Sequence, residues 1–216
     1  MLKNVYRLEP DGKPATSLVV LLHGYGANGQ DLIGLGQQWR GILPNTAFVS
    51  PDAPEPCAMN PFGGFQWFDL TFRDPTEYWR GVVKAAPVLN EFLDQQLTHY
   101  GLDESAMALI GFSQGTMMAL HVGLRRKKQM AAIVGYSGKL AGPENLKADI
   151  SAKPPVLLVH GNADDVVPVA SLDEARQTLD AVGVTTTSHV APGLGHGIDM
   201  KGLELGAKLL VGRLPR

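Results

Sequence analysis

Residues 107–120 read MALIGFSQGTMMAL, in which a short apolar run ends at Gly111 and a helix-like apolar pattern follows Gly115. Ser113 lies between these glycines and completes the Gly-x-Ser-x-Gly signature of a nucleophile elbow, a sharp, strained turn from a strand into a helix. Glycine suits both flanking positions because, without a Cβ, strand and helix can approach closely and push the serine hydroxyl outward. The free N–H groups and positive dipole end of the helix would then lie where an oxyanion forms. Ordinary surface turns also carry this motif, so a catalytic interpretation requires partner residues elsewhere.

Length and composition are those of one globular domain. The chain has 216 residues, of which 44% are hydrophobic and 19% charged, and a chain of this size can bury a sizeable core. We therefore expect a single domain over residues 1–216. The net charge of −2 gives no reason to expect nucleic acid or an anionic membrane as a partner.

Three further features of the sequence bear on the compartment and the partners of the protein. Residues 1–7 contain no apolar signal-peptide core and no apolar run approaches a membrane span, so we expect a cytoplasmic protein without stable membrane insertion. Cys57 is the single cysteine, which excludes an intrachain disulfide. The basic cluster 125–128 falls where the helix after Ser113 should end, and we interpret it as a solvated helix cap rather than a binding patch.

Strand-like and helix-like patterns alternate along the chain. Strands are expected at residues 5–8, 18–22, 47–50, 107–110, 131–136, 156–160 and 185–190. Helices are expected at residues 31–40, 75–100, 114–125, 171–182 and 199–214, with Pro87 kinking or splitting the second. Residues 51–74 and 137–155 are expected to be irregular. The alternation predicts an α/β fold with a mostly parallel central sheet flanked by helices, whose ligands bind beyond the carboxyl ends of the strands.

A serine nucleophile needs an adjacent base that a third group orients. The sequence has six histidines, and His196 lies in a glycine-rich loop between the last strand and the last helix, from which an imidazole can reach across the sheet. The others lie in or near helices and strands, or precede a glycine at a strand end: His23, His99, His121, His160 and His189. His196 is therefore the predicted base.

The orienting carboxylate should follow a strand between Ser113 and His196. Residues 160–168 read HGNADDVVP and offer two adjacent candidates, Asp164 and Asp165. The chain order Ser, Asp, His is that of the α/β-hydrolase fold. The competing interpretation is a metal site formed by the histidines and aspartate of these strand-end loops, but no recognised ligand spacing is present, so we expect no metal and no cofactor.

Several motifs give the chain a family resemblance: LHGYGANG at residues 22–29, PDAP at 51–54, WFD at 67–69, GFSQG at 111–115, the aspartate loop and Gly195-His196. In these it resembles the carboxylesterase/phospholipase family of small α/β-hydrolases, which includes the acyl-protein thioesterases. The resemblance implies the α/β-hydrolase fold, and the chain is too short for a large cap domain. The family pattern His-Gly-x-x-Asp-x-x-Val-Pro makes Asp164 the catalytic aspartate and Asp165 a solvated neighbour.

The resemblance also implies an oxyanion hole and substrate contacts. The backbone N–H of Gln114 follows the nucleophile, and the family pattern places the second N–H donor on Tyr25, where many relatives have leucine. His23 is interpreted as an anchor of that loop. The apolar residues of loop 54–74 either pack the loop onto the sheet or form a pocket beside Ser113. Similarity to the family favours Phe65, Trp67 and Phe68 as pocket walls, and two residues that flank the triad are further candidates: Val167 and Leu194.

Together these residues predict a serine carboxylesterase. Ser113 would attack a carbonyl carbon while His196 takes its proton and Asp164 fixes the imidazole tautomer. Without a cap domain the site should be open to small esters of short or medium chain length. An acyl thioesterase or lysophospholipase is the alternative, and a non-catalytic ligand receptor on the same scaffold would be expected to lack a triad member. Family analogy leaves a homodimer open as an assembly, although the sequence has no marked interface stripe.

Overall fold

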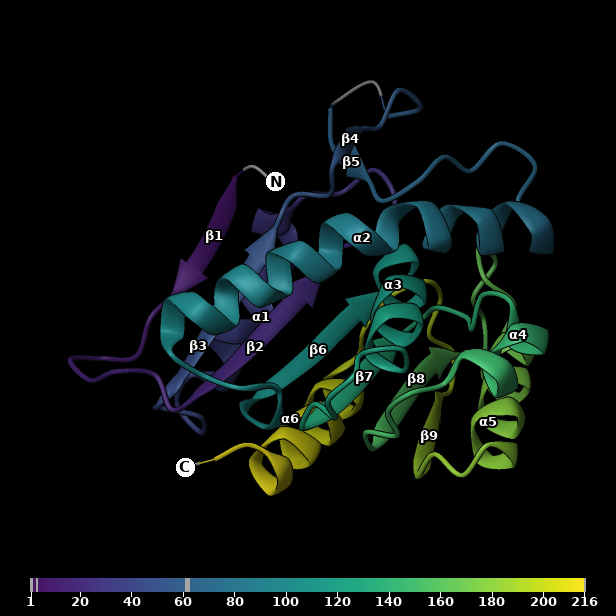
Figure 1. Ribbon diagram of the computed structural model, residues 1–216. Coiled ribbons are helices and arrows are strands. Elements are labelled where there is room, and N and C mark those ends of the chain that lie inside the picture. Colours follow the sequence, from purple (N-terminus) through teal and green to yellow (C-terminus); the bar gives the residue numbers. More distant parts are fainter. Residues whose placement is uncertain (1, 3, 61–62, 216) are drawn as a thin grey trace.

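The computed structural model describes residue 2, residues 4–60 and residues 63–215, and it forms a twisted sheet with helices on both faces (Figure 1). The strands of this sheet are β1 (Val5–Leu8), β2 (Ser17–Leu22), β3 (Thr46–Pro51), β6 (Met107–Phe112), β7 (Ala132–Tyr136), β8 (Val156–Gly161) and β9 (Thr186–Ala191). Their order is β1-β3-β2-β6-β7-β8-β9. β1 pairs antiparallel with β3, and every other neighbouring pair is parallel. The predicted mostly parallel sheet is confirmed.

Helices cover each face of the sheet and create two cores. They are α1 (Gly29–Trp39), α2 (Pro75–Tyr100), α3 (Gln114–Gly123), α4 (Pro143–Asp149), α5 (Ala170–Ala181) and α6 (Met200–Arg213), with a short 3₁₀ helix at Glu104–Ala106. Successive side chains of a strand point to opposite faces: Val20 of β2 packs in the core under α2, α3 and α5, whereas Val19 and Leu21 pack under α1 and α6. No helix in the described part of the chain is both long and apolar enough to cross a membrane.

α2 is one uninterrupted helix, although Pro87 lies inside it. Of the two effects predicted for Pro87, a kink or a split, the split does not occur. Asp74 caps the first turn by accepting a hydrogen bond from the Glu77 N–H, and Gly101 ends the helix in the left-handed conformation with φ 65°. The apolar face that includes Leu89 and Phe92 is buried in the core. Packing of such a face supplies most of the stability of a helix, which offsets the one hydrogen bond that proline removes.

Both segments expected to be irregular contain regular structure. The loop after β3 includes a small hairpin of β4 (Glu55–Pro56) and β5 (Phe65–Gln66), which lies beyond the main sheet at the top of Figure 1. The second segment contains α4, which begins with Pro143 after Gly142 at φ 61°. Proline at the first helical position is a recognised start signal, so α4 was predictable from the sequence.

The basic cluster 125–128 is the predicted solvated helix cap only in part: Arg125 Nη1 donates to the His121 carbonyl oxygen in the last turn of α3, but the two arginines are largely buried. α3 ends at Gly123, and the Arg126 side chain is only 7% exposed, with Nη2 at 2.6 Å from Asp94 Oδ1 and 3.1 Å from Glu104 Oε1. The Arg125 guanidinium lies 5.4 Å from the centre of the Trp79 ring. These arginines therefore hold α2 and the 3₁₀ helix beside the end of α3, while the two following lysines are exposed.

Candidate active site

Ser113 occupies a strained turn between β6 and α3. Its φ of 53° and ψ of −114° are unusual for a residue with a side chain. The Ser113 N–H donates to the Tyr136 carbonyl oxygen at 2.9 Å, which ties the turn to β7. A Cβ at Gly115 would overlap the Leu22 carbonyl oxygen, and one at Gly111 would overlap the backbone of Gly115. The two glycines of the motif are therefore required by the close approach of α3 to β2 and β6.

His196 and Asp164 face each other in the loops after β9 and β8. His196 Nδ1 lies 2.8 Å from Asp164 Oδ2, and the Asp164 side chain is completely buried. The other carboxylate oxygen, Oδ1, accepts the N–H groups of Val166 and Val167, each at 2.9 Å. Burial alone would raise the pKa of Asp164, but the hydrogen bonds from His196, Val167 and Val166 outweigh it and hold that pKa below its usual value. Asp164 is thus an ionised acceptor, while Asp165 is exposed.

The two loops that carry Asp164 and His196 are fastened to each other. The Ala163 N–H donates to the Leu194 carbonyl oxygen at 2.9 Å, and the Gly193 N–H donates to Asn162 Oδ1 at 2.7 Å. A Cβ at Gly161 would overlap the Leu194 carbonyl oxygen. Backbone contacts therefore set the distance between the carboxylate and the imidazole.

A second histidine contacts the same carboxylate. His160 at the end of β8 is 1% exposed, and its Nε2 lies 3.2 Å from Asp164 Oδ2 and 2.8 Å from the Val167 carbonyl oxygen. Because both neighbours are acceptors, the proton of the imidazole belongs on Nε2 and is shared between them. His160 was not among the predicted catalytic residues, although the His-Gly-x-x-Asp pattern contains both His160 and Asp164.

Two backbone N–H groups lie beside Ser113. The Gln114 N–H is the first of α3 and has no carbonyl one turn earlier in the helix to bond. Gly24 packs against the nucleophile, since a Cβ placed there would lie 3.2 Å from the Ser113 Cβ. The next residue is Tyr25, whose N–H makes no backbone hydrogen bond among the described residues, whereas the Gly26 N–H donates to the Phe65 carbonyl oxygen at 2.9 Å.

His23 anchors the loop that carries Tyr25. Its Nδ1 lies 2.7 Å from the Gly24 carbonyl oxygen, and its Nε2 accepts the Ala53 N–H at 2.9 Å. Burial lowers the pKa of His23 and outweighs the opposing effects of Gly24 and nearby carboxylates. A neutral ring protonated on Nδ1 satisfies both contacts, as an anchoring role requires.

The Gln114 side chain joins the nucleophile turn to the loop before α2. It is fully buried; Oε1 accepts the Trp67 N–H at 2.9 Å, and Nε2 donates to the Phe68 carbonyl oxygen at 2.8 Å. The Trp67 indole N–H donates to the His23 carbonyl oxygen at 3.0 Å. Only a backbone role was predicted for Gln114, because residue type alone does not show which distant loop a buried amide will bond.

A cavity of about 180 Å³ opens beside Ser113. Its lining residues come from both strand-end loops, the loop before α2 and the first turns of α2 and α3: Tyr25, Leu70, Arg73, Tyr78, Ser113, Met117, Val166, Val167 and His196. Of these, Met117 was recognisable in the sequence, since it lies one helical turn after Ser113 and so on the same face. No sequence pattern indicated that the polar side chains of Arg73 and Tyr78 would line the cavity.

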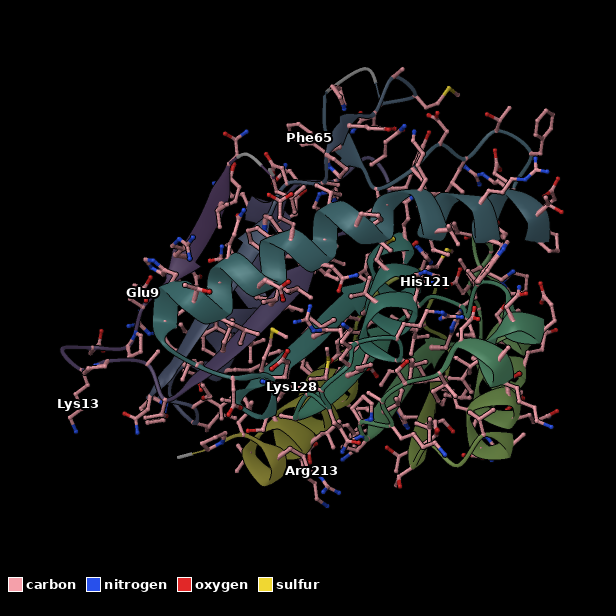
Figure 2. All side chains as sticks on the ribbon, in the orientation of Figure 1. Glu9, Lys13, Phe65, His121, Lys128 and Arg213 are labelled. Atoms are coloured by element: carbon pink, nitrogen blue, oxygen red, sulfur yellow. The ribbon has the colours of Figure 1, made fainter. Side chains whose placement is uncertain are left out.

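Of the five predicted pocket walls, the structure places only Val167 in the lining of this cavity. Trp67 and Phe68 are each 1% exposed and belong to the core, where a Cβ at Gly81 of α2 would overlap the Phe68 ring. Figure 2 shows Phe65 on the β4–β5 hairpin, where it is partly buried against the core and does not line the cavity. Leu194 contributes its carbonyl oxygen to the contact between the strand-end loops.

Ser113 lies on a strained strand-to-helix turn of a mostly parallel sheet, and an aspartate and a histidine follow it in later loops. This arrangement defines an α/β-hydrolase. The phospholipase/carboxylesterase family model matches residues 4–210, and the chain belongs to this family.

Known relatives share this architecture. The esterase YpfH of Escherichia coli is 28% identical over 96% of this chain and 87% of its own length. Acyl-protein thioesterase 1 of Schizosaccharomyces pombe is 32% identical over 71% of this chain and 70% of its own. The crystal structure of esterase PE8 has a TM-score of 0.93 and 44% identity, and covers 97% of this chain and 98% of its own. The chain is a carboxylic-ester hydrolase.

Proposed function

We propose that the protein is a serine carboxylesterase that hydrolyses short- to medium-chain esters through an acyl-enzyme. The observation that carries this proposal is the 2.8 Å contact between His196 Nδ1 and Asp164 Oδ2, on a histidine that lines the same cavity as Ser113. An imidazole held in this way through Nδ1 keeps Nε2 unprotonated and available as a base.

Each residue of the site has a defined role in the proposed reaction. The Ser113 hydroxyl oxygen attacks the ester carbonyl carbon while His196 Nε2 takes its proton, and the N–H groups of Tyr25 and Gln114 bind the resulting oxyanion. His196 then gives the proton to the leaving alcohol oxygen, which leaves an acyl ester on Ser113. Water attacks that ester with His196 again as base, which releases the carboxylic acid and restores the serine.

The size of the cavity favours short acyl groups. Its volume of about 180 Å³ is below the range of about 300–1,000 Å³ that is usual for small-molecule pockets. Val166 at its edge is 50% exposed, so longer chains would extend past it into solvent. We therefore expect turnover to rise up to about the butyrate ester and to fall for long chains.

A substrate panel tests the proposal. Purified protein is assayed on p-nitrophenyl esters of graded chain length, and labelling by a fluorophosphonate is followed by mass spectrometry. We expect hydrolysis of short esters and one adduct on Ser113, both lost in Ser113→Ala and kept in the surface variant Ser105→Ala. Absence of both an adduct and turnover in the folded protein would contradict the proposal and favour a ligand receptor.

Acyl thioester hydrolysis is the second candidate, because a relative that is 32% identical is an acyl-protein thioesterase. Acyl thioesters and lysophospholipid are assayed beside the oxygen esters at matched chain length. A preference for long-chain thioester or lysophospholipid over the butyrate ester would replace the carboxylesterase assignment.

A further inference from the structure

Arg73 brings an unpaired positive charge to the mouth of the cavity beside Ser113. It lies just before α2 and lines the cavity together with Tyr25 and Tyr78. Among the described residues no carboxylate lies within ion-pair distance of its guanidinium. An exposed arginine without a partner can bind an anion without first breaking an ion pair.

The backbone around Arg73 is fixed by Glu77. The carboxylate of Glu77 accepts the N–H groups of Thr71 at 2.7 Å, Phe72 at 3.0 Å and Arg73 at 2.6 Å. Arg73 has φ 55°, a conformation that a side-chain-bearing residue adopts only when its surroundings enforce it. Arg73 is therefore held at the mouth of the cavity by a built turn.

The acidic side chains of the loop before α2 and of its first turn are already bonded within the protein. Glu77 binds three N–H groups, Asp74 accepts the Glu77 N–H at 2.8 Å, and Asp69 accepts a short hydrogen bond from the Gln66 amide. They reduce the positive potential at the mouth, but none of them pairs with Arg73.

The other polar groups at the mouth favour an anion. Burial, and then a hydrogen bond that its hydroxyl donates to Cys57, raises the pKa of Tyr25 to about 12, and burial also raises the pKa of Tyr78. Both phenols are therefore neutral at physiological pH, and the Tyr78 hydroxyl can donate a hydrogen bond to an anion. The ammonium group of Lys139 lies 4.7 Å from the centre of the Tyr78 ring and adds a second positive charge.

We propose that the cavity selects esters that carry an anionic group, a carboxylate or a phosphate, and that Arg73 binds this group while Ser113 attacks the ester carbonyl. The planar guanidinium presents paired N–H donors that match both anions. This inference rests on the proposed function, because it assigns a substrate class to the same nucleophile.

The test compares anionic and neutral esters in two matched pairs. Mono-p-nitrophenyl glutarate and p-nitrophenyl valerate differ by a carboxylate on the acyl side, and 4-acetoxyphenyl phosphate and phenyl acetate differ by a phosphate on the alcohol side. The variant is Arg73→Gln. Its matched control is Arg80→Gln, which removes the same charge from an exposed residue of α2 that does not line the cavity.

We expect Arg73→Gln to lower the anionic-to-neutral ratio of kcat/KM about tenfold in one pair, mainly through KM, as for loss of one charge-assisted hydrogen bond. The pair that responds identifies the side of the ester that carries the anion. In the wild type this ratio should also fall with added salt, and Arg80→Gln should retain it.

This inference alone would be overturned if Arg73→Gln left the anionic-to-neutral ratio of kcat/KM unchanged in both pairs while Ser113 still hydrolysed the neutral esters. Absence of turnover of every ester together with absence of a Ser113 adduct would overturn the proposed function and this inference with it.

Discussion

His160 Nε2 lies 3.2 Å from Asp164 Oδ2, the carboxylate oxygen that also faces His196. With two backbone N–H groups on Oδ1, the buried carboxylate has four N–H neighbours. A carboxylate oxygen can accept more than one donor, so His160 and His196 do not exclude each other. His160 thereby fixes the orientation of the group that orients the base.

Replacing His160 should therefore impair turnover more than substrate binding. We expect His160→Leu to lower kcat about tenfold with little change in KM, since losing one donor lets the Asp164 carboxylate rotate away from His196. His160→Gln, which keeps an N–H donor at a similar reach, should recover most of the loss. Steady-state kinetics with a short ester measures both variants, and an equal fall in both, parallel to a loss of Tm, would indicate a purely structural role.

The strained backbone of Ser113 should be measurable as stability. Glycine tolerates φ near 53° far better than alanine, and such strain costs about 1–3 kcal/mol. Both Ser113→Gly and Ser113→Ala should be inactive, but the glycine variant should be the more stable of the two by about 1 kcal/mol. Ser105, outside the positive-φ residues, is the control, where glycine should be less stable than alanine. Urea denaturation reports both pairs, and the same order at both positions would contradict the assignment of strain.

Gly115→Ala should damage the fold as well as the activity. Its Cβ would overlap the Leu22 carbonyl oxygen, which is backbone of a central strand and cannot move aside. We expect a loss of at least about 3 kcal/mol in the free energy of unfolding, or failure to fold. Gly34 of α1 has open space around its Cβ position, so Gly34→Ala should instead gain about 0.5–1 kcal/mol. Circular dichroism melts of both variants test the contrast.

His121 should make the protein less stable in mild acid. It lies on α3 inside the molecule (Figure 2), its ring 5.5 Å from that of Trp79. Burial, then the nearby charge of Arg125, lowers its pKa to about 4, against the opposing effect of Asp149. Below the ordinary histidine pKa of about 6.5, His121 is protonated in the unfolded chain but stays neutral in the folded protein. The free energy of unfolding therefore falls as pH decreases towards 4.

Between pH 7 and pH 5 this effect should cost the wild type about 2 kcal/mol. His121→Gln removes the titrating group and should lose correspondingly less over the same interval. His23, whose pKa is also lowered by burial, is present in both proteins and cancels in the comparison. Chemical denaturation at the two pH values measures the difference, and parallel losses in the two proteins would show that His121 is not responsible.

Sequence patterns predicted the helices and strands whose burial follows one regular pattern along their length. Residues 156–159 of the predicted strand 156–160 are all apolar because β8 is buried on both faces, and the observed strand is longer by one residue, Gly161. Its loop offered Asp164 and Asp165 as equals, since residue type alone does not show which carboxylate turns inward. The family pattern was needed to choose, and the geometry around Asp164 agrees with that choice.

The walls of the cavity could not be predicted in the same way. Trp67 and Phe68 are aromatic and precede a helix, as wall residues would be, but the loop turns them into the core. Their direction depends on the buried Gln114 amide and on Gly81, which are distant in sequence. Arg73 reaches the cavity because Glu77 bends the backbone before α2. The burial of the two aromatic residues and the position of Arg73 both depend on contacts between residues that are not neighbours in the sequence. A local sequence pattern does not contain such contacts.

The Gln114 amide has a consequence for how this enzyme could diversify. Because it bonds Trp67 and Phe68, the segment up to Phe68 belongs to the same rigid body as the nucleophile. Residues 70–73 lie after that attachment point and before α2, so their composition can change without displacing Ser113. Leu70 and Arg73, which line the cavity, can therefore vary independently of the contacts that hold Ser113 in place.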